Sequence, residues 1–134
     1  MIPFLDAIRK GSMFRPQAFG WFFNHNKTFL GSYVLGSCVM GAALEANIGY
    51  LDDDINFNHL GNLTLSELSK YYPFLNKSAP DHFVKSLQCG ACNDLSIRSI
   101  ANMLACMNDH QRLSREDIAD KLEPFIEEIE ALAT

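Results

Sequence analysis

The sequence has no strongly basic segment and no long apolar run. Its 134 residues include 11 Lys and Arg against 16 Asp and Glu, a formal net charge of -5. Because sequence-independent nucleic-acid binding depends mainly on neutralising phosphates, this balance argues against DNA or RNA binding. No apolar run approaches the roughly 18 to 20 residues that span a bilayer, so no membrane-spanning helix is expected.

Cysteines are few, and the N-terminus lacks the features of an export signal. The first residues, MIPFLDAIRKGSMF, contain an early acidic residue, no long apolar segment and no small-residue cleavage site, which argues against a signal peptide. Without export, the 4 cysteines are expected to stay reduced rather than form a disulfide framework. We therefore expect a cytoplasmic protein with free thiols.

No repeat, low-complexity tract or Gly/Ser- or Pro-rich linker divides the chain. Hydrophobic residues make up 48% and charged residues 20%, which is ordinary globular usage. The helical patterns predict a single, mainly α-helical domain over residues 1–134, with about five helices around a buried central helix. That central helix is expected at residues 37–47, with Ser37 as its N-cap. Its interior is apolar on nearly every side, and the small residues Gly41 and Ala42 predict the close approach of neighbours.

The other helices each have a start or stop signal. Pro16 is expected to begin a further short helix, because the residue before a proline is disfavoured in helices. Pro124 should kink the last helix. We expect helices at residues 3–9, at 64–72 after a TLSE capping box, at 95–108 with Asp94 as N-cap, and from Ser114 onward. The 95–108 helix, the C-terminal helix and the aromatic residues 19–23 are expected to pack on the central helix.

Cysteine and histidine spacing raises the possibility of a zinc site. The order C-x2-C-x13-C-x3-H is close to the spacing of zinc fingers, and the last two ligands lie on one face of a helix. However, a helix beginning near residue 95 would place the two halves roughly 16 Å apart. The site therefore requires a helix that begins near Ile100 and a segment 93–99 that doubles back. The sequence favours the longer helix and a turn at QCGACND. The candidate ligands are Cys89, Cys92, Cys106 and His110.

Cys38 is a candidate nucleophile because it lies at the start of a predicted helix. A helix N-terminus and a histidine together stabilise a thiolate in cysteine-dependent hydrolases and thiol-redox proteins. The match is only the three residues GSC, and no histidine is specified as its partner. A small buried cysteine in the core is the simpler interpretation.

The sequence favours a small non-enzymatic accessory protein that binds a protein partner, with homo-oligomerisation as a further possibility. Seven acidic residues against two basic ones occur between Arg115 and Glu130, and the aromatic segment offers a second surface. No cofactor is expected, apart from zinc in the alternative of a zinc-stabilised binding module. The candidate partner-binding residues are Trp21, Phe22, Glu123, Glu127 and Glu128.

Three segments resemble a family of small uncharacterised bacterial and phage-borne proteins. The family patterns are R-P-Q, C-A-L-G-A-A-x-E-A and L-N-D-x-H-R-W-[ST]-R-E-x-I-A-D-W. Gln111 stands here where the family has a histidine, and Leu113 and Lys121 stand where it has tryptophans. The resemblance implies a fold and a prokaryotic or phage context, and no reaction. The matching positions are residues 15–17, 38–46, 108–109, 114–116 and 118–120.

Overall fold

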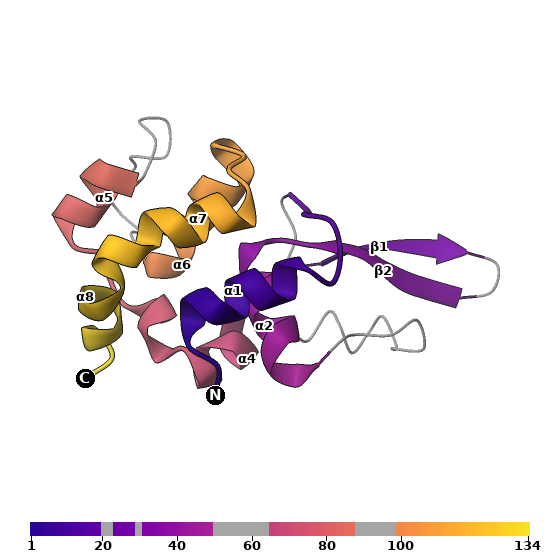
Figure 1. Ribbon diagram of the computed structural model, residues 1–134, viewed down its shortest axis with the longest axis horizontal. Coiled ribbons are helices and arrows are strands. Elements are labelled where there is room, and N and C mark those ends of the chain that lie inside the picture. Colours follow the sequence, from indigo (N-terminus) through magenta and orange to yellow (C-terminus); the bar gives the residue numbers. More distant parts are fainter. Residues whose placement is uncertain (20–22, 29–30, 50–64, 88–98) are drawn as a thin grey trace.

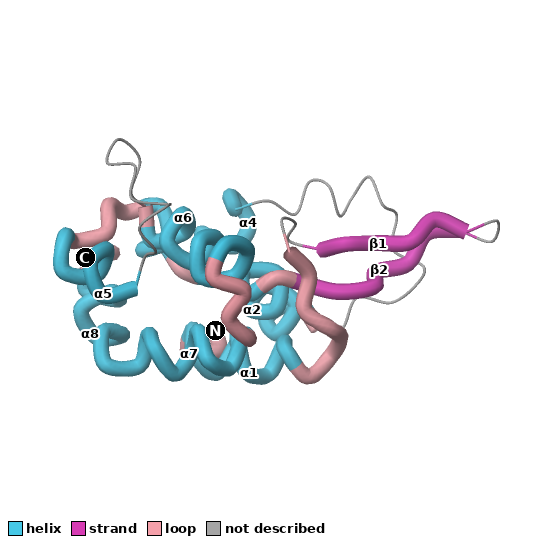
Figure 2. The backbone as a smooth tube through the Cα atoms, turned by 90° about the horizontal axis from the view of Figure 1, so that it is seen from above, coloured by secondary structure: helices cyan, strands magenta, loops and turns pink. Residues whose placement is uncertain are grey.

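The computed structural model describes residues 1–19, 23–28, 31–49, 65–87 and 99–134. These residues form a mainly helical protein, as predicted, with one β-hairpin that extends from the end of the helical body (Figures 1 and 2). The helices are α1 (Phe4–Ser12), α2 (Val39–Ile48), α4 (Leu65–Tyr71), α5 (Asp81–Leu87), α6 (Ile100–Ala105), α7 (Arg115–Leu122) and α8 (Ile126–Ala131). Short 3-10 turns cover Pro73–Asn76 and Glu123–Phe125, and a π-helical turn covers Cys106–His110.

The hairpin was not predicted from the sequence. Strands β1 (Phe23–Thr28) and β2 (Gly31–Ser37) pair antiparallel, with an irregularity in register between Asn24 and His25. The predicted short helix after Pro16 is wrong for residues 16–19. Ala18 N–H donates to the Ser37 carbonyl at 2.8 Å, and Ser37 N–H donates to the Pro16 carbonyl at 3.0 Å. These hydrogen bonds attach the segment to the end of β2 and leave its backbone extended.

The buried central helix is confirmed as α2, where residues 39–46 are all buried. Its N-cap is Cys38 rather than Ser37: Cys38 Sγ accepts a hydrogen bond from Gly41 N–H at 3.4 Å, and Ser37 ends β2. The neighbour of α2 with the most extensive contact is α1, and α6 also contacts it. The sequence predicted α6 in this position but missed α1, and most of the aromatic segment 19–23 lies outside the described residues.

Gly11 allows α1 to approach α2 closely. A Cβ atom added at Gly11 would lie 1.8 Å from the Ala42 carbonyl oxygen, far inside van der Waals contact. The close approach expected at Ala42 is thus observed, and the residue that permits it is a glycine on the neighbouring helix. Figure 1 shows α1 lying across the body beside both α2 and α7.

The C-terminal region follows the sequence prediction closely. Ser114 Oγ accepts a hydrogen bond from Asp117 N–H at 3.0 Å and so caps α7. Pro124 lies in the 3-10 turn that separates α7 from α8, as its missing N–H requires. Ile118, Leu122 and Ile129 are buried in the core. Phe83 of α5 contacts the Phe125 ring edge to face, with ring centroids 5.0 Å apart.

Helix α6 begins at Ile100, later than the predicted start near residue 95. Ser99 has extended backbone angles, and its Oγ accepts a hydrogen bond from Asn102 N–H at 3.1 Å, which makes Ser99 the N-cap in place of Asp94. Ser99 also forms an antiparallel bridge with Ser78. One condition that the sequence set for a metal site, a helix start near Ile100, is therefore met. The other, that residues 93–99 double back, falls mostly outside the described residues. Asp94 itself lies outside the described residues.

In the part of the chain that the structure describes, no helix is both long enough and apolar enough to cross a bilayer.

The connection from the π-helical turn to α7 contains Arg112 in the left-handed region, with φ 52°. Its guanidinium carbon lies 4.4 Å from the centroid of the Phe19 ring. This cation–π contact accompanies a backbone conformation that costs energy for a residue with a side chain.

Candidate functional site

A buried ion pair lies beside the α1–α2 interface. Arg15 Nε donates to Glu45 Oε1 at 2.9 Å, and Arg15 Nη2 donates to Glu45 Oε2 at 2.6 Å. The side chains are 5% and 0% exposed. This bidentate geometry satisfies both oxygens of a carboxylate that a buried helix could not otherwise accommodate.

Arg115 is a second buried guanidinium, from the first turn of α7. Its Nη1 donates to the Ser37 carbonyl at 3.1 Å and to Ser37 Oγ at 2.9 Å. Its Nη2 donates to the carbonyls of Ser12 at 3.1 Å and Arg15 at 2.7 Å. Burial lowers the pKa of Arg115, and the negative charge of Glu45 opposes that shift. Arg115 thus joins the ends of α1 and β2 to α7.

Asn108, from the π-helical turn, completes the arrangement. Its Oδ1 accepts hydrogen bonds from Val39 N–H at 3.1 Å and from Gln17 Nε2 at 2.8 Å. Its Nδ2 donates to the Ala18 carbonyl at 2.9 Å and to Asp109 Oδ1 at 2.7 Å. The side chain therefore connects the first turn of α2 with the segment after α1.

We call these residues the buried polar cluster: Arg15, Gln17, Cys38, Glu45, Asn108 and Arg115. They come from the three segments on which the sequence resemblance rests, and the fold brings them to one place. That these residues form one cluster was not predicted from the sequence. A signal was available in Glu45, because a carboxylate inside an otherwise apolar helix needs a buried cationic partner.

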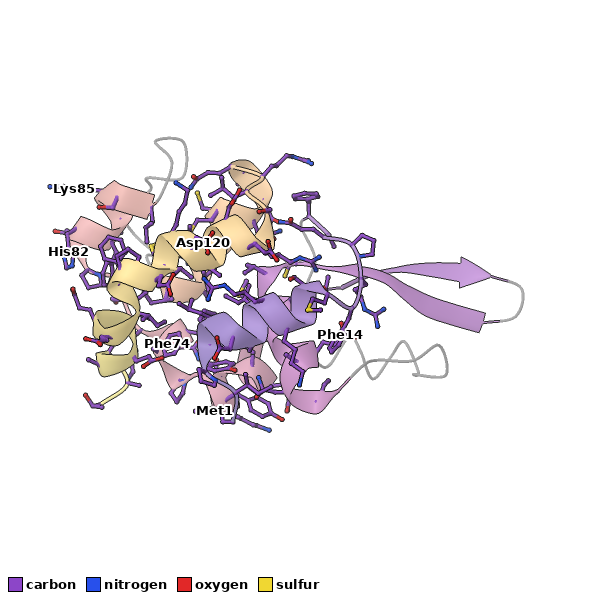
Figure 3. All side chains as sticks on the ribbon, in the orientation of Figure 1. Met1, Phe14, Phe74, His82, Lys85 and Asp120 are labelled. Atoms are coloured by element: carbon purple, nitrogen blue, oxygen red, sulfur yellow. The ribbon has the colours of Figure 1, made fainter. Side chains whose placement is uncertain are left out.

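Cys38 has the opposite properties from those expected of an activated thiol. It is 5% exposed, and burial raises its pKa to about 11, although the N–H groups of Gly41 and Met40 favour the thiolate. Three histidines of the sequence are possible partners of this thiol: His59, His82 and His110. His82 on α5 (Figure 3) pairs with Glu128 Oε2 at 2.6 Å, and His110 is exposed. His59 lies outside the described residues. In this geometry Cys38 acts as the N-cap of α2.

The metal candidates are only partly described. Cys89 and Cys92 lie outside the described residues, whereas Cys106 and His110 belong to the π-helical turn. Cys106 is buried, and its Sγ accepts from Gln111 Nε2 at 3.4 Å; the same Nε2 donates to the Leu87 carbonyl at 2.7 Å. Within the described ranges, no three His, Cys, Asp or Glu residues are grouped so as to hold a metal ion.

The partner-binding candidates are also only partly described. Trp21 and Phe22 lie outside the described residues. Glu123, Glu127 and Glu128 are exposed along the 3-10 turn and α8. Glu128 pairs with His82 as described above, and Glu123 lies 3.5 Å from Arg9 Nη2.

Together these features define a mainly helical protein with a protruding hairpin and a buried polar cluster at the junction of α1, α2 and α7. Comparison with protein-family models, curated proteins and solved structures finds no significant match to this chain. The function must therefore be argued from the side chains themselves.

Proposed function

We propose that this protein is a small non-enzymatic accessory protein that binds a protein partner through an acidic surface on α7 and α8. The sequence resemblance adds a prokaryotic or phage context to this proposal. The acidic surface is defined by the exposed residues Glu116, Asp117, Asp120, Glu123, Glu127, Glu128 and Glu130.

The observation that carries the proposal is the excess of acidic over basic side chains on this surface, which the ion pairs of Asp120, Glu123 and Glu128 offset only in part. Asp120 Oδ1 lies 2.9 Å from Arg9 Nη2, and Glu123 Oε2 lies 3.5 Å from the same nitrogen. Two carboxylates of this surface thus share one arginine. Glu127 and Glu130, one helical turn apart, form no ion pair with any residue in the described ranges. Like charges at this spacing disfavour the helix slightly. A basic partner surface would relieve this repulsion and complement the charge.

The buried polar cluster supports a role other than catalysis. Its Nη hydrogens and amide groups are engaged with interior oxygen atoms, and its thiol is buried with a raised pKa. Such a cluster holds segments together and leaves the outer helical surface to contact a partner.

Charge reversal tests the proposal. The wild-type chain and the double variant Glu127→Lys with Glu130→Lys would be used as baits in cells of the source organism. The control reverses two carboxylates on other helices, the exposed Asp6 and the partly exposed Glu67, in Asp6→Lys with Glu67→Lys. We expect the wild type and the control to retain a partner protein that the acidic-surface variant does not bind. This partner should dissociate from the wild type as the salt concentration rises. Equal retention by all three chains would contradict the proposal.

A zinc-stabilised binding module is a second candidate, favoured by the contacts of Gln111. Its Nε2 bonds both the carbonyl of Leu87 and Cys106 Sγ, so the end of α5 lies beside the π-helical turn. Cys89 follows Leu87 by two residues, a covalent reach of about 7 Å. The proposed ligands Cys89, Cys92, Cys106 and His110 would suit tetrahedral zinc.

Metal analysis tests this second candidate. Protein purified without chelator should contain about one equivalent of zinc, and Cys106→Ala or His110→Ala should reduce it at least several-fold. His82→Ala is the control, because His82 is an exposed histidine on a different helix. Less than about 0.2 equivalents in the wild type would rule the site out, because a structural zinc remains bound during purification.

A further inference from the structure

A cavity of about 220 Å³ opens at the N-terminus of α7, beside the end of α1. It is several times larger than the roughly 30 Å³ that one water molecule occupies in the liquid. Its walls come from segments that the buried polar cluster holds together. The lining residues are Ser12, Gln17, Ser114, Arg115 and Glu116.

Two backbone donors at this end of α7 remain available. Asp117 N–H is taken by Ser114 Oγ, and Ile118 N–H by the Ser114 carbonyl. The N–H groups of Arg115 and Glu116 precede these, and neither makes a hydrogen bond within the described part of the chain. Free N–H groups at a helix N-terminus, together with the helix dipole, favour a negatively charged group.

Arg115 provides the second, independent reason to expect an anion. The side chain is 7% exposed, and its four Nη hydrogens go to neutral oxygens of Ser37, Ser12 and Arg15. Its Nε–H has no hydrogen-bond partner among the described residues, and no described carboxylate lies within ion-pair distance. Since the charge of Arg15 is already matched by Glu45, the buried guanidinium of Arg115 has no counter-ion of its own.

We propose that this cavity binds the oxyanion group, phosphate or carboxylate, of a small molecule. The N–H groups of Arg115 and Glu116, the Arg115 Nε–H and the Ser114 hydroxyl supply the donors. Gln17 donates through Nε2 to Asn108 and to the Leu113 carbonyl, which leaves its side-chain oxygen as an acceptor on the cavity wall. The exposed carboxylate of Glu116 is a second acceptor. These two groups would recognise a hydroxyl or amino group on the rest of the ligand.

Titration of the full chain with two simple anions tests the proposal. Inorganic phosphate and acetate are added separately at constant ionic strength, and amide chemical shifts are followed by two-dimensional NMR. We expect saturable shifts at Arg115 and Glu116 and at the Arg115 Nε–H. The anion with the lower dissociation constant identifies the preferred group.

A pair of neighbouring charge variants makes the result specific. Glu116→Gln removes a negative charge from the cavity wall and should tighten anion binding by about threefold to tenfold. Asp117→Asn removes the same charge one residue away, outside the lining, and should change the affinity less than Glu116→Gln does. Both residues are exposed, so both variants are expected to fold. The absence of saturable shifts with either anion, or equal effects of the two variants, would overturn the proposal.

Discussion

The buried ion pair between Arg15 and Glu45 offers the most direct test of how the cluster holds the fold together. In Arg15→Met, the side chain keeps an unbranched, apolar stem and loses the guanidinium group with its charge. Glu45, 0% exposed in the pair, would then remain in the interior without its bidentate donor. Removing one partner of a buried ion pair typically costs about 3 to 5 kcal/mol, because the remaining charge is left desolvated and unpaired.

This cost is large relative to the total stability of a domain, which is about 5 to 15 kcal/mol. With the usual unfolding entropy per residue, it corresponds to a decrease in Tm of about 10 to 18 °C for a chain of this length. Denaturant unfolding at pH 7, monitored by circular dichroism, measures the change in free energy. The m-value should stay constant if the variant changes stability alone.

The double variant Arg15→Met with Glu45→Leu is the control. It removes both charges, and buried ion pairs replaced by apolar side chains are often neutral or stabilising. We expect the double variant to be more stable than Arg15→Met, with a coupling energy of about 1 to 3 kcal/mol between the two positions. If Arg15→Met costs less than about 1 kcal/mol, or if the two effects simply add, the ion pair does not act as a unit and the reasoning fails.

Three further predictions address other parts of the structure. Gly11→Ala should destabilise the protein by about 1 to 3 kcal/mol or more in denaturant unfolding, because its Cβ would overlap the carbonyl of Ala42; unchanged stability would contradict the close approach. Asn108→Ala should cost about 2 to 4 kcal/mol, because Val39 N–H loses its buried acceptor. The Cys38 thiol, with a folded pKa of about 11 against an ordinary 9.0, stabilises the fold below pH 9. This contribution, about 2 to 3 kcal/mol, should be lost between pH 9 and 11, as unfolding at stepped pH would reveal.

Each of these predictions has a matched control. Lys10→Ala changes an exposed residue next to Gly11 and should alter stability by less than about 0.5 kcal/mol. Asn76→Ala removes an exposed amide, whose hydrogen bond to Ser69 is also exposed, and should alter stability by less than about 0.5 kcal/mol. Cys38→Ala should remove the loss of stability between pH 9 and 11 that the wild type shows. A wild-type curve that matches the Cys38→Ala curve over that range would contradict the raised pKa.

Local signals predicted the helices well where they were strong. Ser114 begins α7 because its hydroxyl satisfies a free N–H, and Pro124 interrupts the helix because it has no N–H to donate. The same reasoning placed the start of α6 too early, because Ser99 has extended backbone angles and the helix begins at Ile100. Ser99 lies five residues after Asp94 and is also a good cap, and its bridge to Ser78, a contact distant in sequence, accompanies the start at Ile100.

The hairpin and the buried polar cluster depend on contacts between distant segments. Ala18 N–H pairs with Ser37, and this pairing overrides the preference of Pro16 for the start of a helix. Arg15 contacts Glu45 across 30 positions in the sequence. Each charged side chain taken alone would be expected at the surface, whereas the fold places the two together in the interior.

The π-helical turn shows how the cluster and the candidate metal ligands are related. Cys106, Met107 and Asn108 are three consecutive buried residues, which a helical surface stripe does not provide. The wider turn places them against different neighbours. Asn108 accepts a hydrogen bond from Val39 N–H at the start of α2. Gln111 Nε2 donates both to Cys106 Sγ and to the Leu87 carbonyl at the end of α5. π-helical turns within helices occur frequently at functional sites. A metal bound at Cys106 would therefore stabilise the same turn that positions Asn108. If the zinc-stabilised candidate holds, chelation of the zinc should weaken the packing of α2 as well as the region around α5.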